Sequence, residues 1–72
     1  MKYIITDQGE VRTGGMYHAD MGRDCEGEVV RAGHYNQKQD GSFVVFGRSE
    51  GYNIESQQED AIILLNNNIK NL

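Results

Sequence analysis

The sequence contains one cysteine and no proline or tryptophan among its 72 residues. Cys25 therefore has no partner for a disulfide within the chain, and no pair of cysteines is present that could begin a metal-binding motif. A lone thiol in a chain whose N-terminus shows no signal-peptide pattern is typical of a cytoplasmic protein. The longest apolar run, Ala61–Leu65, is far too short to span a bilayer, so no membrane partner is expected.

Basic residues are few and scattered along the chain. Seven lysines and arginines stand against eleven aspartates and glutamates, which gives a net charge of −4. Binding to a nucleic-acid backbone needs clustered positive charge, so the composition predicts no nucleic-acid partner. Two or three of these cations can still hold a small anionic ligand. We expect one domain, residues 1–72, which at this length buries only about 60% of its unfolded surface and has a small core.

Several segments have the composition of β-strands. We expect strands over Lys2–Thr6, Glu10–Thr13, Glu28–Tyr35 and Phe43–Arg48. Met16–Met21 fits a strand or a single helical turn, and of the two we favour extended structure. Turn residues join the first two as a hairpin through Gly9, and the dipeptide Asp40-Gly41 joins the last two.

The C-terminal part of the chain has the pattern of an amphipathic helix from about Ser56 to Asn67. Ser56 and Glu59 have the spacing of a capping box, in which each side chain accepts a hydrogen bond from the other residue's backbone N–H. An apolar stripe at helical spacing follows, formed by Ile62, Leu65, Ile69 and Leu72.

Together these patterns predict an α+β fold: a mostly antiparallel sheet of four or five strands, with one C-terminal helix packed on one face. The side chains expected in the core are Ile4, Val30, Phe43, Val45, Ile62 and Leu65.

His18 and Asp20 are the first residues that suggest chemistry. On a strand both would face the same side, so Asp20 could hold one ring nitrogen of His18 while the other acts as a base. The alternative is a surface histidine without a chemical role. His18, Cys25 and His34 do not have the spacing of a motif that fixes a metal geometry, so we expect no metal site.

A loop bracketed by Gly47 and Gly51 joins the last strand to the helix. Backbone N–H groups in such a loop can face an anion, and the hydroxyl of Ser49 can add a further donor. The sequence Gly-Arg-Ser-Glu-Gly is not a nucleophile-elbow pattern, so Ser49 is not expected to be a nucleophile.

Five motifs occur in an order that resembles the Janus/ocnus family, whose members include the small eukaryotic phosphohistidine phosphatases. They are Lys2-Tyr3, Val11-Arg12, Tyr17-His18-Ala19-Asp20, Asp24-Cys25-Glu26 and the stretch from Asn36 to Tyr52. The resemblance runs from Lys2 to about Leu65, which is nearly the whole chain.

The resemblance implies a metal-independent phosphatase, without a cofactor, that acts on phosphohistidine or a related phosphoramidate in a phosphorylated protein or small ligand. It implies that His18 is the catalytic residue, which we interpret as a general base; the alternative is a route through a phosphoenzyme formed on His18. It also implies phosphate-binding roles for Lys2, Arg12, Ser49, Glu50 and Gly51, and we expect supporting roles for Asp20 and Arg31.

The chain also departs from the family. It is shorter than the eukaryotic enzymes, without the helix after their catalytic segment and the strand after their final helix. Arg31 matches the family's arginine only with a gap, and Asn36 replaces a histidine. A second hypothesis is therefore a non-catalytic domain of the same fold, which binds an anion or a protein partner and can form a homodimer through a free sheet edge.

Overall fold

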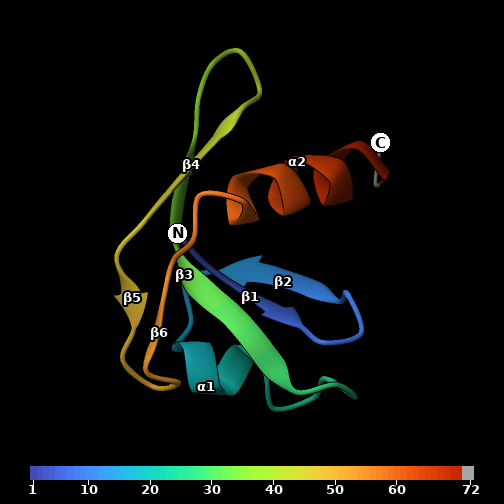
Figure 1. Cartoon of the computed structure of the whole chain (residues 1–72), viewed down its shortest axis with the longest axis vertical. Coiled ribbons are helices and arrows are strands. Elements are labelled where there is room, and N and C mark those ends of the chain that lie inside the picture. Colours follow the sequence, from blue (N-terminus) through green and yellow to red (C-terminus); the bar gives the residue numbers. More distant parts are fainter. Residues whose placement is uncertain (71–72) are drawn as a thin grey trace.

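A four-stranded antiparallel sheet forms the centre of the computed structural model, which describes residues 1–70 (Figure 1). Its strands in chain order are β1 (Lys2–Thr6), β2 (Val11–Gly14), β3 (Val29–Gln37) and β4 (Phe43–Phe46). The remaining elements are the helices α1 (His18–Met21) and α2 (Asp60–Lys70), and a small hairpin of β5 (Arg48–Ser49) and β6 (Ile54–Glu55). The α+β fold predicted from the sequence is confirmed.

The order of strands in the main sheet is β2-β1-β3-β4. Each hairpin turn contains a glycine with positive φ, Gly9 at 82° and Gly41 at 91°, as the two sequence patterns predicted. Antiparallel pairing of β1 with β3 then joins the hairpins and leaves β2 and β4 at the edges.

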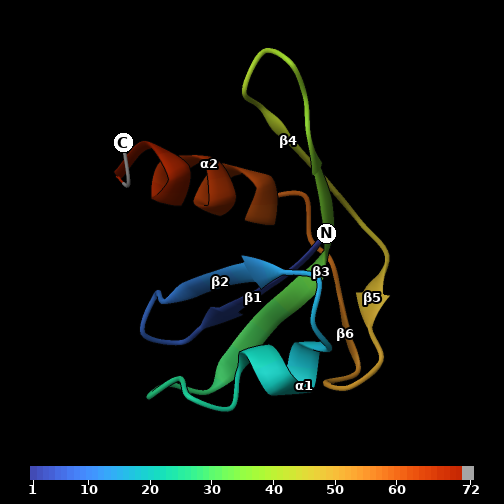
Figure 2. The same cartoon turned by 180° about the vertical axis from the view of Figure 1, so that it is seen from behind.

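The two helices lie on opposite sides of β1 and β3, as Figures 1 and 2 both show. The buried side chains under α2 are Tyr3, Ile5, Val45 and Leu64. Those on the side of α1 are Ile4, Met21 and Ala32. Successive side chains of β1 therefore pack on opposite faces of the sheet, one set under α2 and the other on the side of α1, because the side chains of a strand alternate between its faces.

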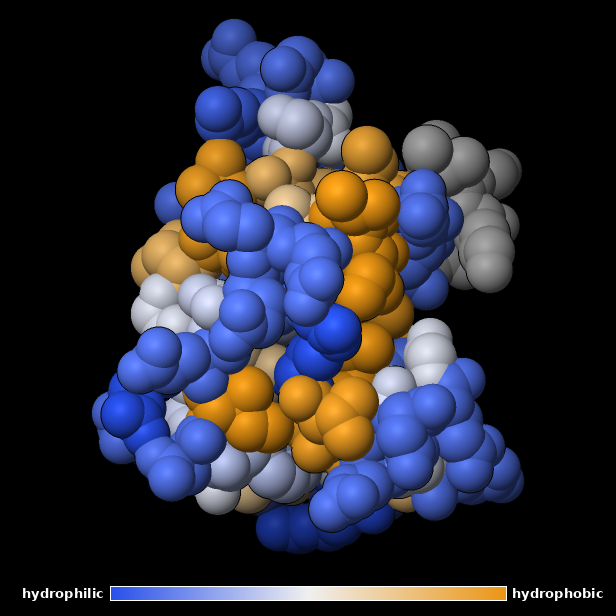
Figure 3. Space-filling view, in the orientation of Figure 1, coloured by the Kyte–Doolittle hydropathy of each residue, from blue (hydrophilic) through white to orange (hydrophobic). Residues whose placement is uncertain are grey.

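The small core leaves several large apolar side chains at the surface, which is normal for a domain of this size. Figure 3 shows apolar side chains on one face of the molecule, with hydrophilic ones both between them and around them. Among the described residues no helix has the length and apolar character needed to cross a membrane.

The prediction of extended structure over Met16–Met21 is wrong, because His18–Met21 forms α1. The N–H of Met21 donates to the carbonyl of Tyr17 at 3.1 Å. His18 and Met21 are both buried, and residues three apart share one side of a helix but lie on opposite sides of a strand. The helix therefore lets both side chains reach the sheet.

The C-terminal helix begins at Asp60, not at Ser56. The N–H of Ser56 is taken by the carbonyl of Gly47 at 3.0 Å, which keeps Ser56 beside the preceding loop. The carboxylate of Asp60, and not that of Glu59, reaches back and accepts from the N–H of Gln57 at 3.1 Å. The capping interaction therefore forms one position later than the predicted Ser56–Glu59 pair.

This shift changes which side chains α2 buries. Leu64 is 2% exposed, whereas the predicted core residue Ile62 is 63% exposed and Leu65 is half-buried. The side chain of Ile69 and the whole of Leu72 lie outside the described part of the chain. Predicted burial is confirmed for Ile4 and Val45, and Phe43 is half-buried.

Val30 is also outside the core, at 44% exposed. Ile5 pairs with Arg31 and Thr6 pairs with Val29, so Val30 is the additional residue of a β-bulge. The bulge places Val29 and Arg31 on opposite faces of the sheet, although they are two positions apart.

Replacing Leu64 with Ala is expected to lower the free energy of unfolding by about 2–5 kcal/mol, because it opens a cavity between α2 and the sheet. Ile62→Ala is the matched control on the same helix and should change stability by less than about 0.5 kcal/mol. Urea unfolding followed by circular dichroism measures both. A larger loss for Ile62→Ala than for Leu64→Ala would contradict this orientation of α2.

Candidate active site

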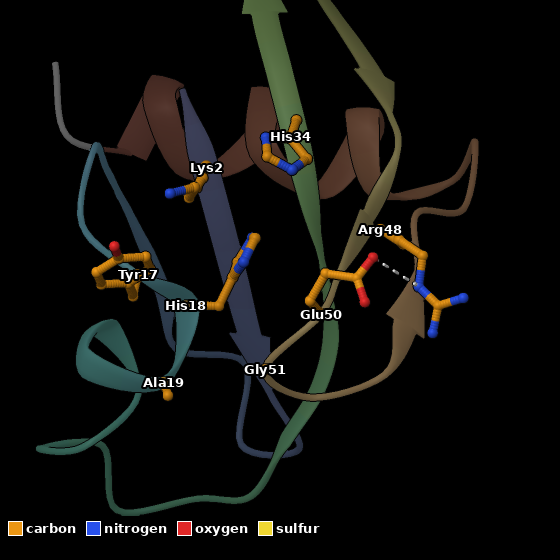
Figure 4. Close-up of a pocket in the computed structure, with 8 residues that line it drawn as sticks. All are labelled: Lys2, Tyr17, His18, Ala19, His34, Arg48, Glu50 and Gly51. Carbon is orange, nitrogen blue, oxygen red and sulfur yellow. Dashed lines mark ion pairs between the residues drawn. The ribbon is translucent and has the colours of Figure 1, made fainter.

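A pocket of about 430 Å³ opens on the α1 side of the sheet. Three parts of the chain line it: the start of α1, the sheet strands β1 and β3, and the β5–β6 hairpin. Their lining residues are Tyr17, His18 and Ala19; Lys2 and His34; and Arg48, Glu50 and Gly51. Figure 4 shows His18 and Glu50 on opposite sides of this space, with Lys2 and His34 above them in the view.

His18 is 6% exposed at the first position of α1, and its ring is held by the sheet. Its Nε2–H donates to the carbonyl oxygen of Gly33 at 2.8 Å. A carbonyl can only accept, so Nε2 carries the proton and Nδ1 holds the lone pair of the neutral imidazole. Within residues 1–70 Nδ1 has no hydrogen-bond partner and no buried side-chain nitrogen is unpaired, so Nδ1 is accessible to water.

The surroundings of His18 favour its neutral form. Burial lowers the pKa of the imidazole, and the nearby positive charges of His34 and Lys2 lower it further, whereas the hydrogen bond to Gly33 acts in the opposite direction. The net pKa lies below the ordinary value of 6.5. At neutral pH, His18 is therefore an uncharged base with one open nitrogen.

Lys2 and Arg48 are the cations at the pocket. The ammonium of Lys2 lies 5.2 Å from the ring centroid of Tyr17, within the range of a cation–π contact. Lys2 forms no ion pair among the residues that the structure describes. Arg48 is engaged, because it lies 3.8 Å from a carboxylate oxygen of Glu50 and donates to the side chain of Asn53.

The loop from Ser49 to Gly51 closes the pocket opposite α1. A Cβ on Gly51 would lie 3.6 Å from the Cβ of Ala19, so the loop and the start of α1 are in direct proximity. No backbone carbonyl in residues 1–70 accepts from the N–H groups of Ala19, Glu50 or Gly51. These donors are free to bind a ligand.

Ser49 itself is fully buried and does not line the pocket. Its hydroxyl oxygen accepts from the N–H of Tyr52 at 3.3 Å. The structure therefore gives Ser49 the task of shaping the loop, while Glu50 and Gly51 reach the pocket.

Three residues that the sequence suggested for the site lie elsewhere. Arg12 pairs with Glu10 at 2.7 Å and does not line the pocket. Arg31 is on the α2 side, where it donates to Asp60 at 2.8 Å. Asp20 pairs with Arg23 at 2.7 Å, so the acceptor that orients His18 is the Gly33 carbonyl.

His34 lines the pocket, although the sequence gave no reason to choose it. It pairs with Lys2 on one side and Phe46 on the other, in one row across β1, β3 and β4. Counting outward from a two-residue turn at Asp40-Gly41 would have paired His34 with Gly47. The observed connection, residues 38–42, shifts the register by one position and pairs His34 with Phe46, so the turn alone did not identify this neighbour.

Within residues 1–70 no group of three or more histidine, cysteine, aspartate or glutamate side chains is arranged to hold a metal ion. Compared with known proteins, the chain matches no family model, no curated protein and no solved structure.

Proposed function

We propose that this protein is a metal-independent phosphatase that acts on phosphohistidine or a related phosphoramidate. The observation that carries the proposal is the state of His18, an uncharged imidazole fixed through Nε2 with Nδ1 open to the pocket. Its substrate is a phosphorylated protein or a small phosphorylated ligand, and the resemblance to the Janus/ocnus family supports this class. The lone Cys25 supports a cytoplasmic location.

In this proposal His18 acts as a general base on water. The water oxygen attacks phosphorus while the P–N bond breaks, and Nδ1 of His18 accepts the proton that the water loses. Positioned proton transfer of this kind is typically worth about 10²- to 10⁴-fold in rate. The products are inorganic phosphate and the free amine or imidazole.

Lys2 and the backbone N–H groups of Glu50 and Gly51 are proposed to hold the phosphoryl oxygens. Fixed donors aimed at a developing negative charge stabilise the transition state without reorganisation. The carboxylate of Glu50 would repel a phosphate, and the guanidinium of Arg48 beside it offsets that charge.

Phosphate binding tests the location of this site. Titration of phosphate, followed by NMR, should shift the amides of Ala19 and Gly51 first. Lys2→Gln should weaken phosphate binding by about tenfold to 150-fold, since a hydrogen bond to a charged group contributes about 1.5–3 kcal/mol. Arg12→Gln removes the same charge outside the pocket and should change affinity less than twofold. Equal losses for the two variants would place the site elsewhere.

The activity itself is tested by release of inorganic phosphate from a phosphohistidine peptide, above the rate of spontaneous hydrolysis. The second hypothesis, a non-catalytic binding domain, is favoured by the edge position of β4, on which Val44 and Phe46 are 40% and 46% exposed. Phosphate binding at the pocket without any turnover would decide for that hypothesis and against the enzyme.

A further inference from the structure

His34 occupies a fixed position at the pocket beside His18. The two rings meet edge to face, at an interplanar angle of 88° and a centroid distance of 5.4 Å. On its other side His34 stacks on Phe46, with centroids 5.6 Å apart. Gly47 has a φ of 72°, and a Cβ there would lie 3.0 Å from Cδ2 of His34, so this glycine allows the chain to pass close to the ring.

The ring nitrogens of His34 are not used by the fold. Neither has a hydrogen-bond partner within residues 1–70, and because no buried side-chain nitrogen there is unpaired, both are accessible to water. His34 is half-buried, whereas His18 is buried. The pocket thus holds two imidazoles, and each has a nitrogen free for proton exchange.

Breaking a P–N bond requires two proton movements. The attacking water must lose a proton, and the departing nitrogen must gain one, because an amine or imidazole leaves poorly as an anion. A single base supplies the first movement only. Paired titratable groups in different environments are the usual means of providing both.

We propose that His34 is the proton donor for the leaving nitrogen, so that His34 and His18 act as an acid–base pair; this inference rests on the proposed function. As water attacks phosphorus, Nδ1 of His18 accepts a water proton and an N–H of protonated His34 transfers its proton to the departing nitrogen. The pair of electrons of the P–N bond stays with that nitrogen. Proton exchange with solvent then returns His18 to its neutral form and His34 to its charged form.

This pairing makes the pH dependence of turnover specific. The other groups at the pocket that can carry charge are Lys2, Tyr17, Arg48 and Glu50. Turnover requires neutral His18 and protonated His34, so kcat/KM should fall at acidic pH through His18 and at alkaline pH through His34. The charges of Glu50 and Arg48 offset each other, because the two side chains form an ion pair. Lys2 is then the remaining fixed charge beside the two imidazoles.

The experiment compares the parent protein with His34→Gln and His34→Phe on a phosphohistidine peptide. Phe keeps a ring for stacking on Phe46 but cannot donate a proton, and thermal unfolding checks that both variants fold. Both should lose about 10²-fold in kcat or more, keep phosphate affinity at alkaline pH within about twofold, and lose the alkaline limb of the pH profile while keeping the acidic limb. Phe46→Leu, the control, keeps the imidazole and should keep both limbs.

The outcomes separate this inference from the proposed function. A parent protein without turnover overturns the proposed function and this inference with it. An active parent whose His34→Phe variant retains kcat within about threefold, or retains its alkaline limb, overturns the role of His34 alone. A variant that loses kcat but shows the parent's pH profile also overturns it, because that pattern indicates a purely structural role.

Discussion

Replacing His18 with Asn is expected to reduce phosphohistidine turnover by about two to four orders of magnitude, the usual range for loss of a general base. The amide of Asn occupies the position of Nδ1 and does not extend to that of Nε2, so the variant loses the hydrogen bond to the Gly33 carbonyl, and thermal unfolding checks that it folds. The amide also cannot accept a proton in the physiological pH range. Phosphate affinity should remain within about twofold, because the donors on Lys2, Glu50 and Gly51 are unchanged. Single-turnover kinetics and phosphate titration measure the two quantities separately.

The pH profile of the parent protein gives a second readout of His18. The base must be neutral to work, so activity falls as pH drops through the pKa of His18. Burial lowers that pKa, so the acidic midpoint of kcat/KM should lie below about 6.5, the value of an unperturbed imidazole. A midpoint above this value would contradict the environment described for His18.

Asp20→Asn is the control for the orientation of His18. Asp20 pairs with Arg23 and not with His18, so this variant should retain turnover within about threefold, as expected for a surface ion pair. A loss as large as that of His18→Asn would show that the Asp20 carboxylate, and not the Gly33 carbonyl, orients the base.

Replacing Asp60 with Ala is expected to lower the free energy of unfolding by about 3–5 kcal/mol, because it breaks a buried charged network. Asp60 is fully buried, and its carboxylate accepts from the Tyr3 hydroxyl at 2.5 Å, from Arg31 at 2.8 Å and from the N–H of Gln57 at 3.1 Å. Burial and the hydrogen bond to Asp60 raise the pKa of Tyr3, which keeps its hydroxyl protonated as a donor. The variant leaves that hydroxyl buried without a partner.

Glu59→Ala is the matched control, since Glu59 also pairs with Arg31 but its side chain is 63% exposed. Exposed ion pairs contribute about 0–1 kcal/mol, so this variant should be nearly neutral. Total stability for a chain of this length is on the order of 4–11 kcal/mol. Urea unfolding should therefore show that Asp60→Ala loses a large fraction of this stability. A change below about 1 kcal/mol would contradict the conclusion that Asp60 stabilises the fold through its contacts with Tyr3 and Arg31.

The sequence predicted the strands well because their signals are local. Alternating side chains and glycine turns define both hairpins without reference to the rest of the fold. The helices were harder. α1 has only four residues, which is too short for any periodicity to appear. The start of α2 depends on whether Glu59 or Asp60 reaches back, and Tyr3 and Arg31, which lie far away in the sequence, decide it.

The same distinction applies to the candidate site. Lys2, His18, Glu50 and Gly51 meet at one pocket, as the motifs suggested. Arg31 lies on the opposite face of the sheet. The bulge at Val30 interrupts the alternation of side chains along β3, so counting residues from the start of the strand does not predict which face Arg31 occupies. A single inserted residue moves every later side chain of a strand to the other face of the sheet. Site residues that lie on strands are therefore the hardest to predict from the sequence.

The central position of β1 has a consequence for folding. Among the described elements β1 is the first to be synthesised, yet its partner β3 and the Asp60 carboxylate that Tyr3 needs come later, the latter fifty-seven positions along the chain. Contacts across such separations must overcome the entropy of closing long loops, which slows folding. The interior of this domain is therefore completed only after α2 has been synthesised, and a nascent chain that ends before Asp60 leaves the central strand of the sheet without the carboxylate that Tyr3 needs.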